Sequence, residues 1–232
     1  MRILKNPLIF ALDVDSEEEA FKKLNPIIDL VGGVKIGPRL ACRYGAPLIQ
    51  KISEQTSVFV DNKYFDIPST MKAAVKASFD AGATLVTVHA LAGIEALKDL
   101  SRLELELNQI RPFKILAVTI LTSWDKDSLP ENMHSWSIEN HVKSLSQLVY
   151  LSGLRGLVCS GHELEMIPQK DFFKVVPGIR LSSDESSQDQ KRIMTPKQAI
   201  KAGAQAIVVG RPILDSSHPR ETVLEILESC SS

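Results

Sequence analysis

The sequence has few of the features that mark secreted, membrane or disulfide-stabilised proteins. It contains three cysteines, Cys42, Cys159 and Cys230, and no Cys-x-x-Cys pair. Scattered cysteines in an odd number predict free thiols in a reducing compartment. No apolar run approaches the roughly 20 residues of a transmembrane helix, and the residues after Met1 lack the apolar stretch of a signal peptide. We therefore expect a cytoplasmic protein.

Charge of one sign is also missing. The 27 Lys and Arg residues nearly balance the 28 Asp and Glu residues, which leaves a formal net charge of −1. Such a chain has no long-range field for nucleic acid or an anionic membrane, so neither is expected as a partner, and an anionic ligand would be held by local groups. The five histidines show no metal-ligand spacing. No metal site and no cofactor are predicted.

The sequence does contain a regular alternation of short apolar runs and amphipathic segments. The apolar runs have the composition of strands that are buried on both faces. They cover residues 8–12, 34–36, 57–63, 85–89, 115–121, 156–159, 173–176 and 206–209. Helical patterns follow them at about residues 16–28, 47–55, 68–81, 94–108, 138–152, 162–167, 195–201 and 221–228.

Eight such alternations predict an α/β protein, a closed (β/α)8 TIM barrel that forms a single catalytic domain over residues 1–232. A doubly wound open sheet is the alternative, but no Gly-x-Gly-x-x-Gly fingerprint follows the first apolar run. Local signals support the helix starts. Ser16 and Glu19 have the spacing of a capping box, and Thr195-Pro196 offers a good cap and first residue.

Polar residues gather where the apolar runs end, which is the edge of the barrel that carries the chemistry in this architecture. The densest group is the segment 61–66, which places Asp61, Lys63 and Asp66 within six residues. Alternate side chains of a strand share a face, so Asp61 and Lys63 should point the same way. Because an unpaired buried charge is expensive, such charges indicate a site rather than a core. The other polar residues at predicted strand ends are Asp13, Lys35, His89, Thr122, Ser123, Arg180 and Arg211.

Two glycine–arginine segments, 178–180 and 210–211, follow the last two predicted strands, where barrels commonly bind phosphate. Backbone N–H groups and an arginine fork suit a phosphate dianion. The alternative is that Arg211 caps a helix or pairs with Asp215. The polar, aperiodic residues 181–191 are interpreted as a lid from which Gln190 could reach a ligand.

Taken in order, these segments resemble the orotidine 5′-phosphate decarboxylase family, most closely its short bacterial form, over essentially the whole chain. The matching segments are Asp13, Val34-Lys35-Ile36-Gly37, Asp61-x-Lys63-x-x-Asp66-Ile67-Pro68-x-Thr70, Leu121-Thr122-Ser123, Pro177-Gly178-Ile179-Arg180, Asp189-Gln190 and Gly210-Arg211-Pro212. The resemblance implies the decarboxylation of orotidine 5′-phosphate to UMP, the last step of de novo pyrimidine synthesis. It also implies electrostatic catalysis without a cofactor.

The resemblance further implies roles for single residues. The implied catalytic residues are Lys35, Asp61, Lys63 and Asp66, with Lys63 as the proton donor to C6 of the pyrimidine. Asp66, Ile67 and Thr70 match residues that reach the neighbouring subunit's site, which implies a homodimer with shared active sites. The other implied substrate contacts are Asp13 and Lys35 for the ribose, Thr122 for the pyrimidine, Arg180, Gln190, Gly210 and Arg211 for the phosphate and lid, and the rest of the segment, Asn62, Tyr64, Phe65, Pro68 and Ser69.

Two other functions remain open. A magnesium-dependent sugar-phosphate aldolase or decarboxylase of the same superfamily would share Asp-x-Lys-x-x-Asp but generally carries an acidic residue where Lys35 stands. A non-catalytic nucleotide-binding barrel would bind UMP without turnover, and the intact Lys63 and Asp66 argue against it. The chain departs from the common bacterial pattern at Asn62, Tyr64, Ser69, Leu91 and Leu181. A polar residue at position 62, expected to face the helix layer, has no explanation in the sequence.

Overall fold

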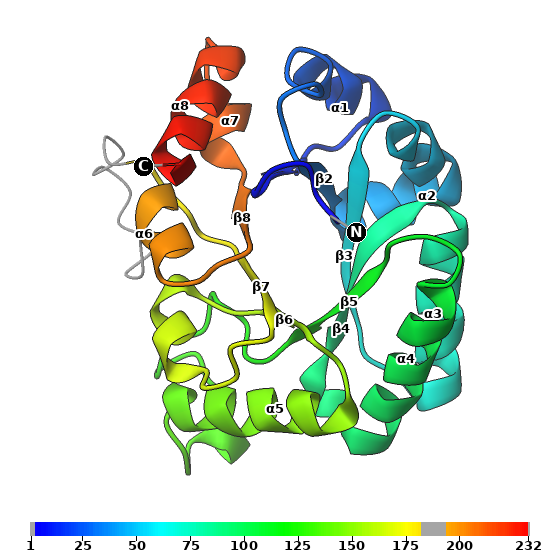
Figure 1. The fold of residues 1–232 in the computed structure, drawn as a ribbon, viewed down its shortest axis with the longest axis vertical. Coiled ribbons are helices and arrows are strands. Elements are labelled where there is room, and N and C mark those ends of the chain that lie inside the picture. Colours follow the sequence, from blue (N-terminus) through cyan, green and yellow to red (C-terminus); the bar gives the residue numbers. More distant parts are fainter. Residues whose placement is uncertain (1–2, 182–193, 232) are drawn as a thin grey trace.

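The strands close into a parallel barrel with the helices arranged around it (Figure 1). The structure, a computed structural model, describes residues 3–181 and 194–231. The strands are β1 (Leu8–Ala11), β2 (Gly33–Ile36), β3 (Ser57–Tyr64), β4 (Ala83–His89), β5 (Lys114–Val118), β6 (Gly156–Val158), β7 (Phe173–Val176) and β8 (Ala206–Val209). Each strand pairs with the next in the chain, and β1 pairs with β8. The predicted (β/α)8 barrel is confirmed, and the open sheet is excluded.

The helices lie outside the strands. They are α1 (Glu17–Leu24), α2 (Pro38–Ser53), α3 (Pro68–Asp80), α4 (Ile94–Leu107), α5 (Ile138–Ser152), α6 (Pro196–Lys201), α7 (Arg211–Leu214) and α8 (Pro219–Ser231). Short 3₁₀ turns lie at Ala90–Ala92 (η1), Glu131–Met133 (η2) and Gly161–Met166 (η3). None of the helices within residues 3–181 and 194–231 is both long and apolar enough to cross a membrane.

Strand side chains alternate between two apolar layers. One cluster of buried residues fills the barrel interior and includes Ile9, Phe59 and Leu85. The other lies between the strands and the helices and includes Phe10 and Val60. Adjacent residues of one strand, such as Ile9 and Phe10, therefore face opposite layers, as the two-residue period of a strand requires. This alternation decides which residues at the strand ends point into the barrel mouth.

Several local signals for helix starts are confirmed. The Ser16 hydroxyl accepts a hydrogen bond from the backbone N–H of Glu19 at 3.1 Å, which makes Ser16 an N-cap. The reciprocal bond of the predicted capping box, from the Ser16 N–H to the Glu19 side chain, does not form in the described structure. Thr195 and Gln198 form a reciprocal capping box at the start of α6. Pro68 occupies the first turn of α3, where its missing N–H costs nothing.

Several predicted boundaries are wrong, and the first helix ends at Leu24 rather than near residue 28. The second helix begins at Pro38 rather than near Pro47, and Gly45 interrupts it with φ 55° and ψ −146°. Glycine adopts a positive φ without the usual steric cost, so the chain turns there and resumes the helix at the following proline. The fifth strand ends at Val118 rather than Leu121. The short α7, which begins at Arg211, was not predicted.

Candidate active site

The carboxyl ends of β1, β2 and β3 bring four charged side chains together. The Lys35 ammonium lies 3.0 Å from Asp13 Oδ1 and 3.8 Å from Asp61 Oδ2. The Lys63 ammonium lies 3.0 Å from the other oxygen, Asp61 Oδ1. Asp61 is therefore shared by two lysines, and its side chain is only 15% exposed. This ion-pair chain, Asp13–Lys35–Asp61–Lys63, contains three of the four residues of the predicted catalytic set and lacks Asp66.

The end of β3 departs from regular strand geometry at the charged residues. Val60 pairs with Val86, and the next pair in register joins Tyr64 to Val88. The segment 61–63 therefore lies opposite the single residue Thr87, so β3 bulges here by more than the usual one extra residue. Within residues 3–181 and 194–231, Lys63 is the one non-glycine residue with a positive φ, 48°. A side chain in this region is strained by about 1–3 kcal/mol, and such strain persists where the surroundings hold it.

Thr87 closes this bulge. Its hydroxyl oxygen accepts a hydrogen bond from the backbone N–H of Lys63 at 2.9 Å. The same hydroxyl donates to Asp61 Oδ1 at 2.9 Å. Thr87 is fully buried and faces the barrel interior, two residues after the interior residue Leu85. Thr87 was not predicted as a site residue, because a threonine inside a valine-rich strand gives no signal of its own.

A cavity of about 440 Å³ opens at the barrel mouth beside the ion-pair chain. Its lining comes from six strands or the turns after them. The lining residues are Lys35, Phe59, Asp61, Lys63, Val118, Leu121, Thr122, Ser123, Val158, Val175, Pro177 and Val208. The predicted contact Thr122 is thus placed at this cavity with three of the charged residues. The apolar wall opposite them lowers the local dielectric, which strengthens every charge interaction in the cavity.

The predicted phosphate residues lie on the β7 and β8 side of the mouth. Gly210 caps α7, and a Cβ there would approach the Ala11 side chain to 3.3 Å. Arg211 is the exposed first residue of α7, and in the described part of the chain it forms no ion pair with Asp215. Arg180 is buried, and its backbone N–H donates to the carbonyl of Met194 at 3.2 Å. The lid residues 182–191, including Gln190, lie outside the described residues.

The remainder of the segment, Asp66 to Thr70, is exposed and turned away from the charges of its own chain. Asp66 Oδ1 accepts a 2.6 Å hydrogen bond from the backbone N–H of Ile67. Among residues 3–181 and 194–231 it has no ion-pair partner. Phe65 and Ile67 are 61% and 64% exposed, which is high for large apolar side chains. One chain therefore brings Asp61, Lys63 and Lys35 together but not Asp66.

Asn62 and Tyr64 face the helix layer rather than the cavity. The Asn62 side-chain amide donates to the Tyr64 hydroxyl at 3.0 Å. That hydroxyl lies 2.9 Å from the Ser78 hydroxyl on α3, which donates to the carbonyl of Ala74 at 3.0 Å. This relay of hydrogen bonds gives the Asn62 side-chain amide a partner for its N–H group, whereas its Oδ1 is buried with no partner among the described residues. Any ligand contact of residues 62 and 64 would therefore use their backbone atoms.

His89 ends β4 beside the site. Its Nδ1 accepts a hydrogen bond from the backbone N–H of Leu91 at 3.3 Å, which caps η1. Its ring lies 5.7 Å from the ring of Phe65. Burial, assisted by the positive charge of Lys63, lowers the pKa of His89. The lowered pKa favours the uncharged ring that accepts this hydrogen bond, which suits a structural role for His89.

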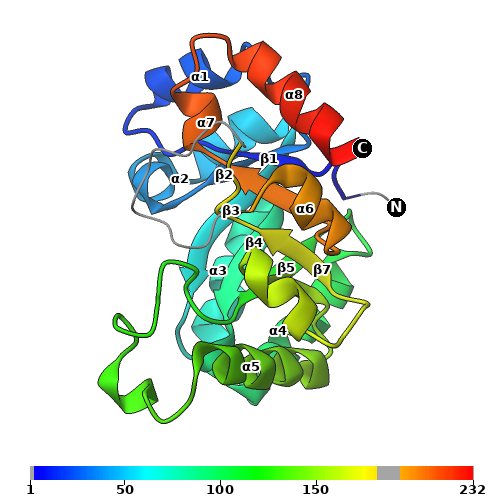
Figure 2. The same cartoon turned by 90° about the vertical axis from the view of Figure 1, so that its left-hand side faces the viewer.

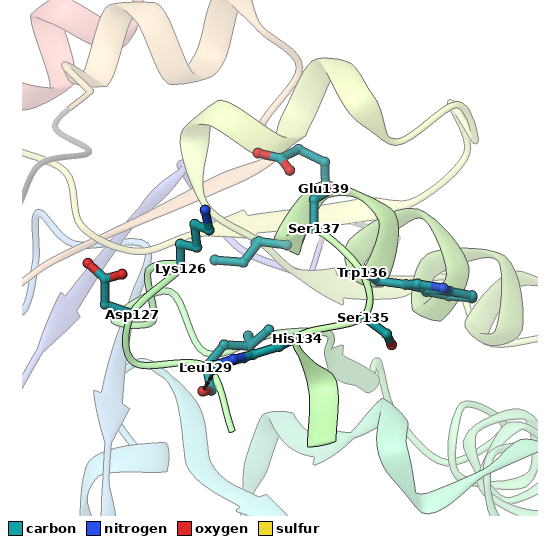
Figure 3. A pocket seen from close by; sticks show the side chains of 9 residues that line it. Lys126, Asp127, Leu129, His134, Ser135, Trp136, Ser137 and Glu139 are labelled. Carbon is teal, nitrogen blue, oxygen red and sulfur yellow. Dashed lines mark hydrogen bonds between the residues drawn. The ribbon is translucent and has the colours of Figure 1, made fainter. Parts of the chain in front are cut away.

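A larger cavity, about 610 Å³, lies in the connection between β5 and α5, which extends away from the barrel (Figure 2). Its lining runs from Lys126 to Glu139 and includes Leu129, His134 and Trp136 (Figure 3). Most of these side chains are exposed. The smaller cavity is the better candidate site because it has paired, half-buried charges at strand ends. In the part of the chain that the structure describes, no three His, Cys, Asp or Glu side chains form a group that could hold a metal ion.

The fold and the site define the chain as a (β/α)8-barrel protein with a lysine–carboxylate cluster at the catalytic end of the barrel. Comparison with known families gives the next step. The sequence profile of the Orotidine 5'-phosphate decarboxylase / HUMPS family matches residues 6–226. The chain therefore belongs to this family, as its motifs predicted.

Individual relatives agree with this assignment. The chain is 36% identical over 231 residues to the orotidine 5'-phosphate decarboxylase of Maridesulfovibrio salexigens, which covers 97% of this chain and 99% of that protein. It is 36% identical over 228 residues to the protein of the same name from Wolbachia pipientis subsp. Culex pipiens, covering 97% and 98%. The crystal structure of orotidine 5'-phosphate decarboxylase from Lactobacillus acidophilus superposes with a TM-score of 0.81 at 33% identity, covering 98% of this chain and 100% of that one.

Proposed function

We propose that this protein decarboxylates orotidine 5′-phosphate to UMP without a cofactor, in the last step of de novo pyrimidine synthesis. The observation that carries the proposal is the chain of ion pairs Lys35–Asp61–Lys63 at the cavity of a barrel of this family. The relatives named orotidine 5'-phosphate decarboxylase support the same substrate. We further propose that residues 1–232 act as one catalytic domain in the cytoplasm.

The proposed chemistry uses electrostatics and one proton. Loss of carbon dioxide leaves an electron pair on C6 of the pyrimidine, and the ammonium of Lys63 donates a proton to that carbon. Asp61, 3.0 Å away, pairs with the ammonium and would aim it at that carbon. Two unit charges 4 Å apart interact by about 1 kcal/mol in water and about 4 kcal/mol at an effective dielectric near 20. The array therefore acts with full strength when solvent is excluded from the cavity.

The ligand would span the mouth of the barrel. Asp13 and Lys35, which pair at 3.0 Å, are proposed to contact the ribose hydroxyls. Thr122 lines the cavity and is proposed to contact the pyrimidine. Gly210 and Arg211, with Arg180 and the lid residue Gln190, are assigned to the phosphate. The phosphate takes no part in the bond change, but its binding energy would hold the closed form of the site.

We also propose that the active unit is a homodimer with shared sites. Asp66 belongs to the predicted catalytic set but lies outside the ion-pair chain of its own subunit. It sits next to the exposed apolar side chains Phe65 and Ile67, and Leu91 near them is 42% exposed. A neighbouring subunit that covers these side chains would bury apolar surface and receive Asp66 in its own cavity.

A spectrophotometric assay tests the reaction. Purified protein should consume orotidine 5′-phosphate, followed by the loss of its absorbance, at the same rate with and without EDTA. A rate that EDTA abolishes and magnesium restores would favour the magnesium-dependent sugar-phosphate enzymes of the superfamily. Binding of UMP without any turnover would favour a nucleotide-binding barrel.

A mixing experiment tests the shared sites. Lys63→Ala and Asp66→Ala proteins should each be inactive, and after subunit exchange about a quarter of the sites should regain both groups, because half of the dimers are mixed and each has one intact site. The control is each variant mixed with itself. If exchange is verified and no activity returns, Asp66 does not act across the interface.

A further inference from the structure

The hydroxyl of Thr87 makes two hydrogen bonds that both end on the charged residues of β3. A backbone N–H can only donate, so the bond from Lys63 fixes the hydroxyl oxygen as its acceptor. The single hydroxyl proton is then left for Asp61 Oδ1. A carboxylate acceptor makes this second bond charge-assisted and therefore stronger than a neutral one.

These bonds close a ring through Lys63. The backbone N–H of Lys63 reaches Thr87, Thr87 reaches Asp61 Oδ1, and the same oxygen lies 3.0 Å from the Lys63 ammonium. The backbone N–H and the side-chain ammonium of Lys63 are thus both linked to Asp61 Oδ1, the first through Thr87 and the second directly. The ring lies in the bulge of β3, where Lys63 has a φ of 48°. A lysine keeps this strained backbone conformation only where its surroundings hold it.

We propose that Thr87 is a positioning residue that holds Lys63 and Asp61 in the catalytic geometry. Because Thr87 is fully buried, it acts through these two residues and not by touching a ligand. Without the hydroxyl, the N–H of Lys63 loses its partner at the bulge, and the backbone relaxes toward an ordinary strand. That change would swing the ammonium away from the cavity. The inference rests on the proposed decarboxylase function for its kinetic readout only.

Thr87→Val tests the proposal because valine has nearly the shape of threonine and lacks the hydroxyl. With two hydrogen bonds lost, one to a charged group, we expect kcat to fall by about 10- to 100-fold while KM changes little. Thr87→Ser keeps the hydroxyl and should retain most of the rate. A structural role alone would lower the stability of both variants without this split between kcat and KM.

Thr119→Val is the matched control. Thr119 follows β5, is fully buried, and its hydroxyl has no hydrogen-bond partner among the residues that the structure describes. It is not one of the described residues that line the cavity. This variant should keep the wild-type kcat. If Thr87→Val does not fold, the smaller Thr87→Ala is compared with Thr87→Ser in its place.

A crystal structure of the variant gives a readout that does not depend on turnover. In Thr87→Val, φ of Lys63 should leave the positive region, and the distance from the Lys63 ammonium to Asp61 Oδ1 should exceed 4 Å, the limit of an ion pair. Unchanged geometry, or a wild-type kcat in Thr87→Val, would overturn the proposal. If the wild-type protein has no decarboxylase activity, the proposed function falls, and these structures still decide the role of Thr87.

Discussion

Each end of the barrel holds a group of opposite charges at a strand end, and the two groups are built differently. At the amino end of β5, Glu104 of α4 accepts from the Lys114 ammonium at 2.9 Å and from the backbone N–H of Ile115 at 2.5 Å. At the carboxyl end of β3, Asp61 is divided between Lys63 and Lys35. The first group joins a helix to a strand. The second opens into a cavity.

The two groups differ in the exposure of their charged side chains and in the strain of their backbone. Glu104 and Lys114 are 10% and 20% exposed, and their backbone has ordinary geometry. Lys63 is 38% exposed and has a strained φ. A residue that serves stability is held by its best partners, whereas strain and exposure at one end of an ion pair indicate a group kept available for a ligand. The barrel follows the general rule that its carboxyl end carries function and its amino end stability.

Lys63→Ala removes one of the charges at the carboxyl end of β3, and it should have the largest effect on activity. We expect kcat/KM to fall by about 10³-fold or more, since the proton donor is lost, while the free energy of unfolding changes by less than about 1 kcal/mol because this pair is partly exposed. Lys76→Ala is the control, since Lys76 forms an exposed pair with Asp80 at 2.7 Å. Turnover that survives in Lys63→Ala would contradict the assignment of the proton donor.

Glu104→Ala removes the carboxylate of the pair at the amino end of β5, and it should lower stability rather than activity. Its pKa is raised by burial, and its loss leaves Lys114 and the N–H of Ile115 without their partner. We expect a loss of about 3 kcal/mol in the free energy of unfolding, measured by urea denaturation, with kcat unchanged. Glu95→Ala on the same helix breaks the exposed pair with Lys98 and should cost less than about 1 kcal/mol. Equal costs for the two variants would remove the contrast between the groups.

The barrel itself was predictable because its strands are buried on both faces and its helices carry caps. Short apolar runs such as Ile9 to Ala11 are typical of buried strands. Ser16 and Thr195 mark helix starts because their hydroxyls accept hydrogen bonds from the first turn. Boundaries failed where a tertiary choice overrides a local signal. The turn at Gly45 lets α2 begin nine residues before the proline that marked its start.

The charged residues of the site could be predicted from the sequence, but the residues that hold them in place could not. Asp61, Lys63 and Lys35 stand out because charges at strand ends have few structural uses. Thr87 and the Asn62–Tyr64–Ser78 relay were missed, since their meaning depends on which residues the bulge brings opposite one another. No period in the sequence records that three residues of β3 face one residue of β4. The expectation that Asn62 faces the helix layer follows from strand alternation alone, and it is confirmed by the relay.

Tyr64→Phe should sharpen the comparison within β3 itself. The hydroxyl joins Asn62 to Ser78 on the outer side of the strand, so its removal should lower the free energy of unfolding by about 1–2 kcal/mol and leave kcat within a few-fold. Tyr44→Phe is the control, because the Tyr44 hydroxyl forms no hydrogen bond with the residues described. A large loss of kcat in Tyr64→Phe would mean that the outer side of the strand also positions Lys63.

The smallest expected effect concerns His89, which is buried like Glu104 at the amino end of β5 but lies beside the candidate site. Burial, and then the charge of Lys63, lowers its pKa in the folded chain, while in the unfolded chain the pKa returns to about 6.5. Between these two values the unfolded chain binds more protons, so the free energy of unfolding should rise with pH, by at most about 1.4 kcal/mol per pH unit. The stabilisation is complete above about pH 6.5 and is lost as the pH falls through that window.

His89→Asn isolates this contribution, because asparagine can still accept from the N–H of Leu91 but does not titrate. The difference in the free energy of unfolding between the wild type and this variant, measured from pH 5 to 8, should therefore grow with pH up to about 6.5 and then level off. In the Lys63→Ala background the same difference should depend less on pH, since one of its two causes is gone, yet it should not vanish, because burial is the larger cause. A pH-independent difference would mean that solvent reaches the imidazole of His89, and the cavity side of β4 would then be wetter than its burial implies.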